Sequence, residues 1–527
     1  MRQPILMAVA LVMAAGASVW AEQPAATPAA TTTNAPAMKI AWRAPEPPTR
    51  ADLGQAYMRL ERVLAANPQT PERLTELEKR FDRLTALFFR GDFAGAIKAV
   101  DEMTQDIARD LVPPDAAAAE RLAMSLRVIV SPAVRLRGDA TPIEARVVAL
   151  YPVELPDGAT FELSVKVKTW RSDPAKTLEA KMRITPDASR PLDVRLTLPA
   201  PMEMPTDAAF VEVYVNGQRG SWTPLTLTAT PIAAIREGFI KRLDALPAIS
   251  PTDRDRAEWA GLIAAARARA ELLVAEPSAQ NSAEFLANPL LLIGQVETEV
   301  TALERGDNPF KGRTGDYWSG VGLGGGAVLP VRVYVPPKLD QAKPAPLLLA
   351  FHGAGGDENL FMEGYGAGLI KRLADERGFI VFSPRTEVTG SSPAAFAALL
   401  AAARRDYSID PDRVYAVGHS MGAGLTALLA GSQQSELAAV ACLAGGPRWT
   451  PKADIVPTLV IGAEFDPIIP AAGLQAAAER GVKAGAAIEY RLAKGHGHSL
   501  MVGSVLGEAV DWLLSKKRAA GGAGDAR

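Results

Sequence analysis

The stretch that decides the fold reads VYAVGHSMGAG and runs from residue 414 to residue 424. Its first four residues form an apolar run typical of a buried strand, and the small apolar residues at its end predict a helix. Gly418 and Gly422 flank Ser420, and glycines at both positions permit a cramped strand-to-helix turn. A serine before a helix is more often a cap. The strand before Ser420 nevertheless favours a nucleophile, with His419 as a variable residue of the turn that needs no chemical role.

A carboxylate follows a later predicted strand. The run IGAEFDP spans residues 461–467 and starts at the end of that strand. A carboxylate in this loop can orient a catalytic imidazole and stabilise its cation. We prefer Asp466 to Glu464, because the x-D-P-x-x-P arrangement puts Asp466 in the loop rather than at the strand edge. For either residue alone, the alternative is an acidic cap of a turn.

Two histidines compete for the role of general base. The run KGHGHS spans residues 494–499, between the last expected strand and the closing helix. Serine, then acid, then histidine is the order that this kind of sheet uses. We prefer His498 to His496 because His498 lies nearer the helix. The alternative is that the two form a metal pair, but the sequence offers no further histidine or cysteine to complete the shell there.

A glycine-rich loop follows another expected strand and reads FHGAGG, residues 351–356. Backbone N–H groups of such a loop can face an oxygen that becomes negatively charged in a transition state. Ala354 is the preferred donor and Gly355 the second choice, with the N–H of Met421 as the partner donor. The alternative is a simple turn before a helix.

Strands and helices alternate from residue 312 to residue 517, which predicts a mainly parallel sheet with helices on both faces. The expected strands are 331–335, 347–351, 378–383, 413–418, 438–443, 458–462 and 488–492, and the main helices are 364–377, 393–405, 423–431 and 471–484. Gly320, Gly322 and Gly325 match a dinucleotide-binding pattern. That pattern requires a strand before it and a helix after it. We therefore expect a loop there.

These residues resemble the α/β-hydrolase superfamily, in particular its feruloyl esterases, polyhydroxybutyrate depolymerase-like enzymes and prolyl-oligopeptidase-like enzymes. The resemblance covers about residues 315–515. It is carried by the runs LPVRVYVP (329–336), HGAGG (352–356), IDPDRVY (409–415) and the serine turn, and by the GHS run ending at Ser499. It implies Ser420 as nucleophile, His498 as base and then acid, Asp466 as its orienting carboxylate, and an oxyanion hole from the N–H groups of Ala354 and Met421. This chain has Ala423 where a second glycine is common, and it lacks the disulfides of many secreted members.

The residues before the resemblance divide by pattern. Arg2 and an uncharged run too short to span a membrane predict a signal peptide over 1–21, with an uncleaved anchor as the alternative. The composition of 22–50 predicts a tether. Helical spacing predicts modules over 51–112 and 231–306, and the second could pack against the first or cover the next domain. Period-two alternation and about seven short strands predict an immunoglobulin-like β-sandwich over 120–230, either a passive spacer or a contact for a polymer or protein partner.

Composition excludes several classes of function. The chain has 527 residues, 57 lysines and arginines against 59 aspartates and glutamates, and a net charge of −2, so nucleic-acid binding is not expected. One cysteine, Cys442, excludes a disulfide scaffold and reads as a small buried hydrophobe. We expect no membrane span after signal removal, no cofactor and no metal. Residues 518–527 are expected to be a flexible tail.

The sequence therefore predicts an exported serine hydrolase, periplasmic or secreted. We expect it to cleave small-molecule or polymer-derived carboxylic esters through an acyl-enzyme. One alternative is a prolyl-oligopeptidase-like peptidase, although no propeller repeat is visible. The other is a catalytically inactive binding or scaffold protein, against which the intact serine, acid and histidine argue.

Overall fold

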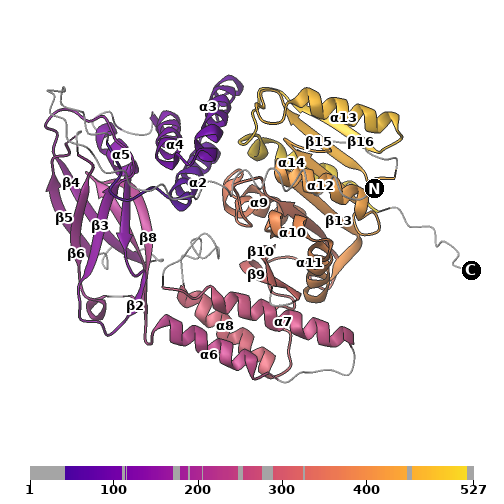
Figure 1. The fold of residues 1–527 in the computed structure, drawn as a ribbon, viewed down its shortest axis with the longest axis horizontal. Coiled ribbons are helices and arrows are strands. Elements are labelled where there is room, and N and C mark those ends of the chain that lie inside the picture. The colour runs from indigo at the N-terminus through magenta and orange to yellow at the C-terminus, as the bar shows by residue number, and fades with distance from the viewer. Residues whose placement is uncertain are drawn as a thin grey trace, which may run out of the picture. The chain divides into compact units, whose positions relative to one another are not determined.

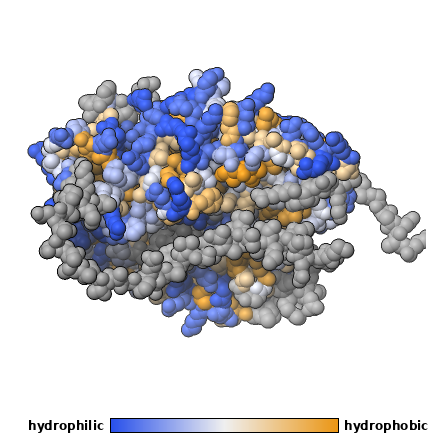
Figure 2. Space-filling model, turned by 45° about the horizontal axis from the view of Figure 1, so that its top comes forward, coloured by the Kyte–Doolittle hydropathy of each residue, from blue (hydrophilic) through white to orange (hydrophobic). Residues whose placement is uncertain are grey.

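The computed structural model describes residues 42–109, 113, 116–169, 178–187, 190–204, 206–246, 253–275, 289–324, 327–447 and 454–518. The predicted signal peptide, most of the predicted tether and the tail after Arg518 lie outside these ranges. No helix within them is long and apolar enough to cross a membrane. In the view of Figure 2, hydrophilic residues cover most of the described surface and apolar residues form smaller groups between them.

The first described element is a set of helices joined by capped turns. Thr70 caps one helix by accepting the N–H of Arg73, with Pro71 at the first helical position. Asp92 caps the next by accepting the N–H of Gly95. The helices are α2 (Arg50–Ala66), α3 (Pro71–Phe89), α4 (Phe93–Ala108) and α5 (Ala117–Met124).

Two sheets follow and share one apolar core. One has the strand order β1-β3-β6, and the other β2-β8-β7-β4-β5. A hairpin turn at Asn216 and Gly217 joins β7 to β8, with φ values of 45° and 82°. The strands are β1 (Leu126–Val130), β2 (Val134–Leu136), β3 (Ile143–Ala149), β4 (Phe161–Thr169), β5 (Leu178–Ile184), β6 (Asp193–Leu198), β7 (Ala208–Val215) and β8 (Gln218–Thr228). The immunoglobulin-like assignment stays a prediction.

The end of the predicted tether differs from the expectation. Trp42 packs against the core of the two sheets, and Glu46 forms an ion pair with Arg146 of β3. A tryptophan buries a large apolar surface, which offsets the ordering entropy of the residues around it. The part of the tether that the structure describes is therefore attached to the sheets.

Three more helices cover the edge of the next sheet. Helix α7 (Asp253–Glu271) packs on β9 (Gly315–Gly324), and apolar residues of α6 (Ile232–Asp244), α7 and α8 (Pro289–Glu304) share a core with Trp318. The sequence left open whether this segment packs against the first helical module or covers the next domain. The structure places it against β9, with a further contact to Val134 of β2.

The last sheet has the strand order β16-β15-β14-β13-β11-β12-β10-β9, with helices on both faces (Figure 1). β10 runs antiparallel to both β9 and β12, and the other pairs are parallel. Its remaining elements are β10 (Ala327–Val335), β11 (Ala345–Phe351), α9 (Leu369–Arg377), β12 (Ile380–Pro384), α10 (Thr386–Ser391), α11 (Pro393–Asp406), β13 (Ile409–His419), α12 (Met421–Ser432), β14 (Ala439–Leu443), β15 (Thr458–Ala463), α13 (Ala471–Lys483), β16 (Ile488–Ala493) and α14 (Met501–Leu514).

The loop predicted around Gly320 and Gly322 is wrong. Both glycines lie in strand β9, which pairs with β10. A Cβ atom at Gly320 would lie 2.7 Å from the Cβ of Ala268, and one at Gly322 would lie 2.9 Å from the Cβ of Ala264. The glycines therefore let α7 approach the sheet closely, and no helix follows them as a dinucleotide site requires. Gly325 lies outside the described residues.

Candidate active site

Ser420 stands on the turn between β13 and α12. Its φ is 53° and its ψ is −113°, a strained conformation for a residue with a side chain. Its N–H donates to the carbonyl of Leu443 at 3.0 Å, which fixes the turn against β14. A Cβ atom at Gly422 would overlap the carbonyl oxygen of Phe351, so only glycine lets α12 start this close to β11. The strand, turn and helix lie where the sequence predicts them.

The structure brings three of the predicted site residues into contact. The Nε2 atom of His498 lies 2.9 Å from Oγ of Ser420, and its Nδ1 atom lies 2.7 Å from Oδ2 of Asp466. The other oxygen of Asp466 accepts the N–H groups of Ile468 and Ile469, each at 2.8 Å. Asp466 and His498 are both buried. The imidazole thus bridges a hydroxyl and a carboxylate whose second oxygen is already bonded.

The competing residues Glu464 and His496 do not make these contacts. Glu464 accepts the N–H of Gly495 at 2.7 Å, and Nδ1 of His496 lies 2.6 Å from Oε1 of Glu78. Both contacts hold the loop before His498, and neither is made to the imidazole of His498. The bond to Glu78 also raises the pKa of His496.

The glycine-rich loop after β11 reaches the serine turn. A Cβ atom at Gly353 would lie 3.3 Å from the Cβ of Ser420 and 2.8 Å from Nδ1 of His419. Within the described residues, the N–H groups of Ala354 and Met421 have no backbone acceptor. Gly355 has a φ of 81°, which turns the chain directly after Ala354. The N–H of Gly355 also has no backbone acceptor in the described residues, so either Ala354 or Gly355 can serve as a donor together with Met421.

His419 has structural partners that the sequence did not reveal. Its Nδ1 atom lies 2.7 Å from the hydroxyl of Tyr365, and its Nε2 atom lies 2.9 Å from the backbone carbonyl of His498. A carbonyl can only accept, so Nε2 carries the proton and Nδ1 accepts from Tyr365. Burial lowers the pKa of His419 to about 3, which keeps the ring neutral. His419 therefore joins the serine turn to the loop of His498.

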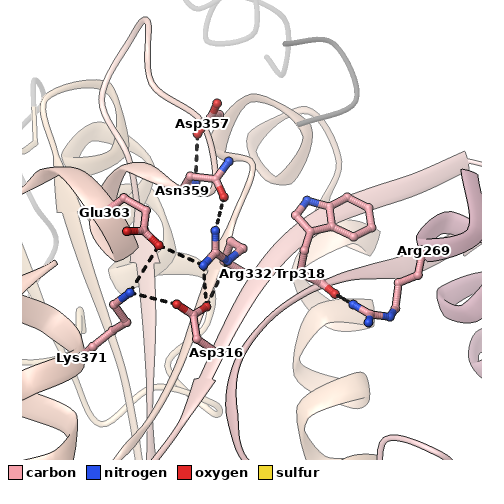
Figure 3. A network of polar contacts seen from close by, with 8 residues as sticks. All are labelled: Arg269, Asp316, Trp318, Arg332, Asp357, Asn359, Glu363 and Lys371. Carbon is pink, nitrogen blue, oxygen red and sulfur yellow. Dashed lines mark hydrogen bonds and ion pairs between the residues drawn. The ribbon is translucent and has the colours of Figure 1, made fainter. Parts of the chain in front are cut away.

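A polar network is centred on the buried Arg332 and includes Asn359, in the segment after the glycine-rich loop (Figure 3). Arg332 donates to Asn359 and to Asp316, at 2.6 Å in each case, and lies 3.2 Å from Glu363. Lys371 completes it by contacting Asp316 at 2.9 Å and Glu363 at 3.3 Å. Breaking the pairs of Arg332 is costly, because its buried guanidinium would be left without a partner. The network fixes the segment that follows the loop.

Two acidic residues of α3 also reach the site, although they come from outside the last sheet. Oε2 of Glu78 accepts the N–H of Gly497 at 2.6 Å, and Oδ2 of Asp82 accepts the N–H of His498 at 2.8 Å. Burial raises the pKa of Asp82 to about 6. Sequence reasoning missed both residues. Their spacing of four places them on one helix face, but acidic residues on a helix usually mark a solvated face.

No protein-family model and no curated protein matches the chain. Several solved structures are similar. The S-formylglutathione hydrolase FrmB of Staphylococcus aureus shares 14% identity with a TM-score of 0.31, over 36% of this chain and 94% of that chain. Thermogutta terrifontis esterase 2, phosphoramylated by tabun, shares 15% identity with a TM-score of 0.33, over 38% and 94%. A thermostable esterase shares 16% identity with a TM-score of 0.33, over 75% and 100%. These values are too low to transfer a function.

Proposed function

We propose that this chain is a serine hydrolase of the α/β-hydrolase type that cleaves carboxylic esters through an acyl-enzyme. One observation carries the proposal: the imidazole of His498 lies between the Ser420 hydroxyl and the Asp466 carboxylate, with both contacts at hydrogen-bond distance. A nucleophile, a base and an orienting acid in this arrangement perform acyl transfer in unrelated folds. The strained turn that carries Ser420 supports the same role.

Each step of the reaction uses a contact described above. Oγ of Ser420 attacks the ester carbonyl while Nε2 of His498 takes its proton. Asp466 stabilises the resulting imidazolium through Nδ1 and remains ionised. The N–H groups of Ala354 and Met421 receive the oxyanion. His498 then returns the proton to the leaving alcohol, and water repeats the sequence to release the acid.

The test compares the mature wild-type chain with Ser420→Ala. We expect the wild-type protein to hydrolyse short p-nitrophenyl esters and to be labelled on Ser420 by a fluorophosphonate, and Ser420→Ala to do neither. Ser432→Ala is the matched control, because Ser432 ends the same helix and bonds only the carbonyl of Leu428 in the described contacts. A wild-type protein that neither turns over nor labels would contradict the proposal and favour a binding or scaffold role.

A substrate panel then separates esters from peptides. Amine is a poorer leaving group than alcohol, so peptide cleavage depends more strongly on protonation by His498. We expect aryl and alkyl esters to be cleaved and matched peptide amides to remain intact. Faster cleavage of the amides would instead favour the peptidase.

We also infer that the chain is exported. The support is the charged Arg2 followed by an uncharged run from Ile5 to Val19 and a small-residue site ending at Ala21. Intact mass measurement of protein isolated from the producing cells is expected to show a chain that begins near Glu22. A mass that includes Met1 would contradict cleavage.

A further inference from the structure

One face of α3 lies along the loop that carries His498. Thr75, Glu78 and Asp82 are three and four residues apart in turn, a spacing that aligns side chains on one side of a helix. All three contact the loop from Gly495 to His498, which lies more than four hundred residues further along the chain. A helix outside the last sheet therefore forms one wall of the histidine loop.

The side chains of α3 contact the backbone of three residues of this loop: Gly495, Gly497 and His498. The hydroxyl of Thr75 donates to the carbonyl of Gly495 at 2.7 Å. Glu78 accepts the N–H of Gly497 with one oxygen and contacts Nδ1 of His496 with the other, each at 2.6 Å. Asp82 accepts the N–H of His498 at 2.8 Å. A Cβ atom at residue 497 would overlap Asp82, so the loop has glycine where the carboxylate approaches.

These two carboxylates are buried at a cost. Glu78 is 1% exposed and Asp82 is 6% exposed. Oδ1 of Asp82 has no hydrogen-bond partner among the described residues, and burial raises the pKa of this side chain. A helix that only separated two domains would leave its acidic side chains in water. The hydrogen bonds to the N–H groups of Gly497 and His498 partly offset the free-energy cost of burying the two carboxylates.

The loop is restrained from more than one side. Its backbone N–H at His498 is held by Asp82, while the backbone carbonyl of His498 accepts Nε2 of His419. The imidazole is held by Asp466. Without the contacts from α3, the loop would keep its bonds to Glu464, to the N–H of Phe465, to the serine turn and to Asp466, but the N–H groups of Gly497 and His498 would lose their acceptors. A displacement of about 1 Å at a reacting group can reduce a rate about 100-fold.

We infer that Glu78 and Asp82 are positioning residues, which hold the backbone of residues 497 and 498 so that the imidazole of His498 meets Ser420. The inference rests on the proposed function and extends it to the helices that precede the two smaller sheets. Under this inference, helix α3 of the N-terminal helical module contributes to the geometry of the active site.

The test uses the full mature chain with Ala and amide variants at both positions. Asp82→Asn and Glu78→Gln keep an acceptor oxygen for the loop N–H, whereas Asp82→Ala and Glu78→Ala remove it. Glu76→Ala is the matched control, because Glu76 lies on the same helix, is exposed and pairs only with Arg73 in the described contacts. The readouts are kcat and KM for a p-nitrophenyl ester, the rate of fluorophosphonate labelling, and amide hydrogen exchange over residues 495–500.

The Ala variants are expected to lower kcat and the labelling rate by about 10- to 100-fold with KM changed less than about threefold. The amide variants should recover kcat to within about threefold, and exchange of the loop should quicken only in the Ala variants. Glu76→Ala should match the wild type. Thermal unfolding of each variant shows whether it is folded at the assay temperature.

Three kinetic results would overturn the inference: Ala variants with the wild-type kcat, amide variants as slow as the Ala variants, or a loss that falls on KM alone. Unchanged hydrogen exchange in the Ala variants would overturn it even without an activity readout. A wild-type protein that neither turns over nor labels is a different result. It would overturn the proposed function and the catalytic role of the loop with it, whatever the exchange rates were.

Discussion

At the scale of single residues, Asp466 determines which ring nitrogen of His498 carries the hydrogen. Its Oδ1 atom is held by two backbone N–H groups, which leaves Oδ2 to accept from Nδ1 of His498. An ionised carboxylate has no proton to donate, so Nδ1 carries the hydrogen and the lone pair of Nε2 faces Ser420. The imidazole therefore presents an acceptor to the Ser420 hydroxyl, as the proposed role of general base requires.

Asp466→Asn reverses that arrangement, because the amide can donate to Nδ1 and favour the other tautomer of His498. We expect kcat to fall by about 10⁴-fold, the size of the effect of the same substitution in serine proteases. Steady-state kinetics with a p-nitrophenyl ester measures it. Glu464→Gln is the matched control and should stay within a few fold of the wild type, since Glu464 bonds only the N–H of Gly495 in the described contacts. Equal losses in both variants would contradict the role of Asp466.

Tyr365 supports the site through His419. Its hydroxyl donates to Nδ1 of the buried ring. In Tyr365→Phe that nitrogen is left without its partner, so we expect the free energy of unfolding to fall by about 1–3 kcal/mol and kcat to fall several-fold. Urea unfolding and ester kinetics measure the two effects. Tyr490→Phe, which removes a hydroxyl at 3.2 Å from the carbonyl of Ala471, should cost less and leave kcat unchanged. A Tyr365→Phe protein as stable as the wild type would show that the bond from Tyr365 to His419 contributes nothing to stability.

At the scale of elements, the motifs that follow strands were predictable because each is local. Ser420 directly follows strand β13, and Asp466 and His498 lie in the loops after β15 and β16; parallel topology brings such positions to one edge of a sheet. Strand β9 was missed because four glycines give it a low strand propensity, and its pairing with β10 and packing on α7 are tertiary. Glu78 and Asp82 were missed because their partners lie more than four hundred residues away.

Helix α2 contains the buried acid Glu61, which makes the stability of the fold depend on pH. Burial raises the pKa of Glu61 to about 7, although Tyr57 and the N–H of Gly366 bond its carboxylate. The folded state therefore binds a proton more tightly than the unfolded state, in which the pKa is near its ordinary value of 4.5. This contribution to stability is complete below about pH 4.5 and is lost as the pH rises through 7.

Glu61→Gln removes the titration while keeping an acceptor for Gly366. We expect the change in Tm between pH 5 and pH 8 to be smaller in the variant than in the wild type, by the equivalent of at most about 3 kcal/mol. Thermal unfolding at both pH values measures it. Glu76→Gln, an exposed change on α3, should behave as the wild type does. An identical pH response in Glu61→Gln would show that Glu61 does not titrate in this window.

At the scale of the whole molecule, charged pairs join segments that the sequence pattern separates. Arg269 of α7 bonds Glu299 of α8 at 2.9 Å and also donates to the backbone carbonyl of Trp318 in β9. Arg313 contacts the same carboxylate at 2.6 Å. Arg269 and Glu299 are almost fully buried, and burial lowers the pKa of Arg269. Glu299 therefore balances two guanidinium groups where the helices meet the sheet.

Removing this one carboxylate should destabilise the attachment of α7 and α8 to the sheet. In Glu299→Ala both guanidinium groups lose their partner, and an unpaired buried charge costs about 3–5 kcal/mol. We expect a clear fall in Tm by calorimetry. Glu297→Ala is the matched control: Glu297 lies two residues away on the same helix, is exposed, and pairs with Arg242, so its loss should cost less than about 1 kcal/mol. If the two variants unfolded at the same temperature, the buried carboxylate would contribute no more than a surface ion pair, and the attachment of the helices to β9 would depend on apolar packing and on the bond from Arg269 to the carbonyl of Trp318.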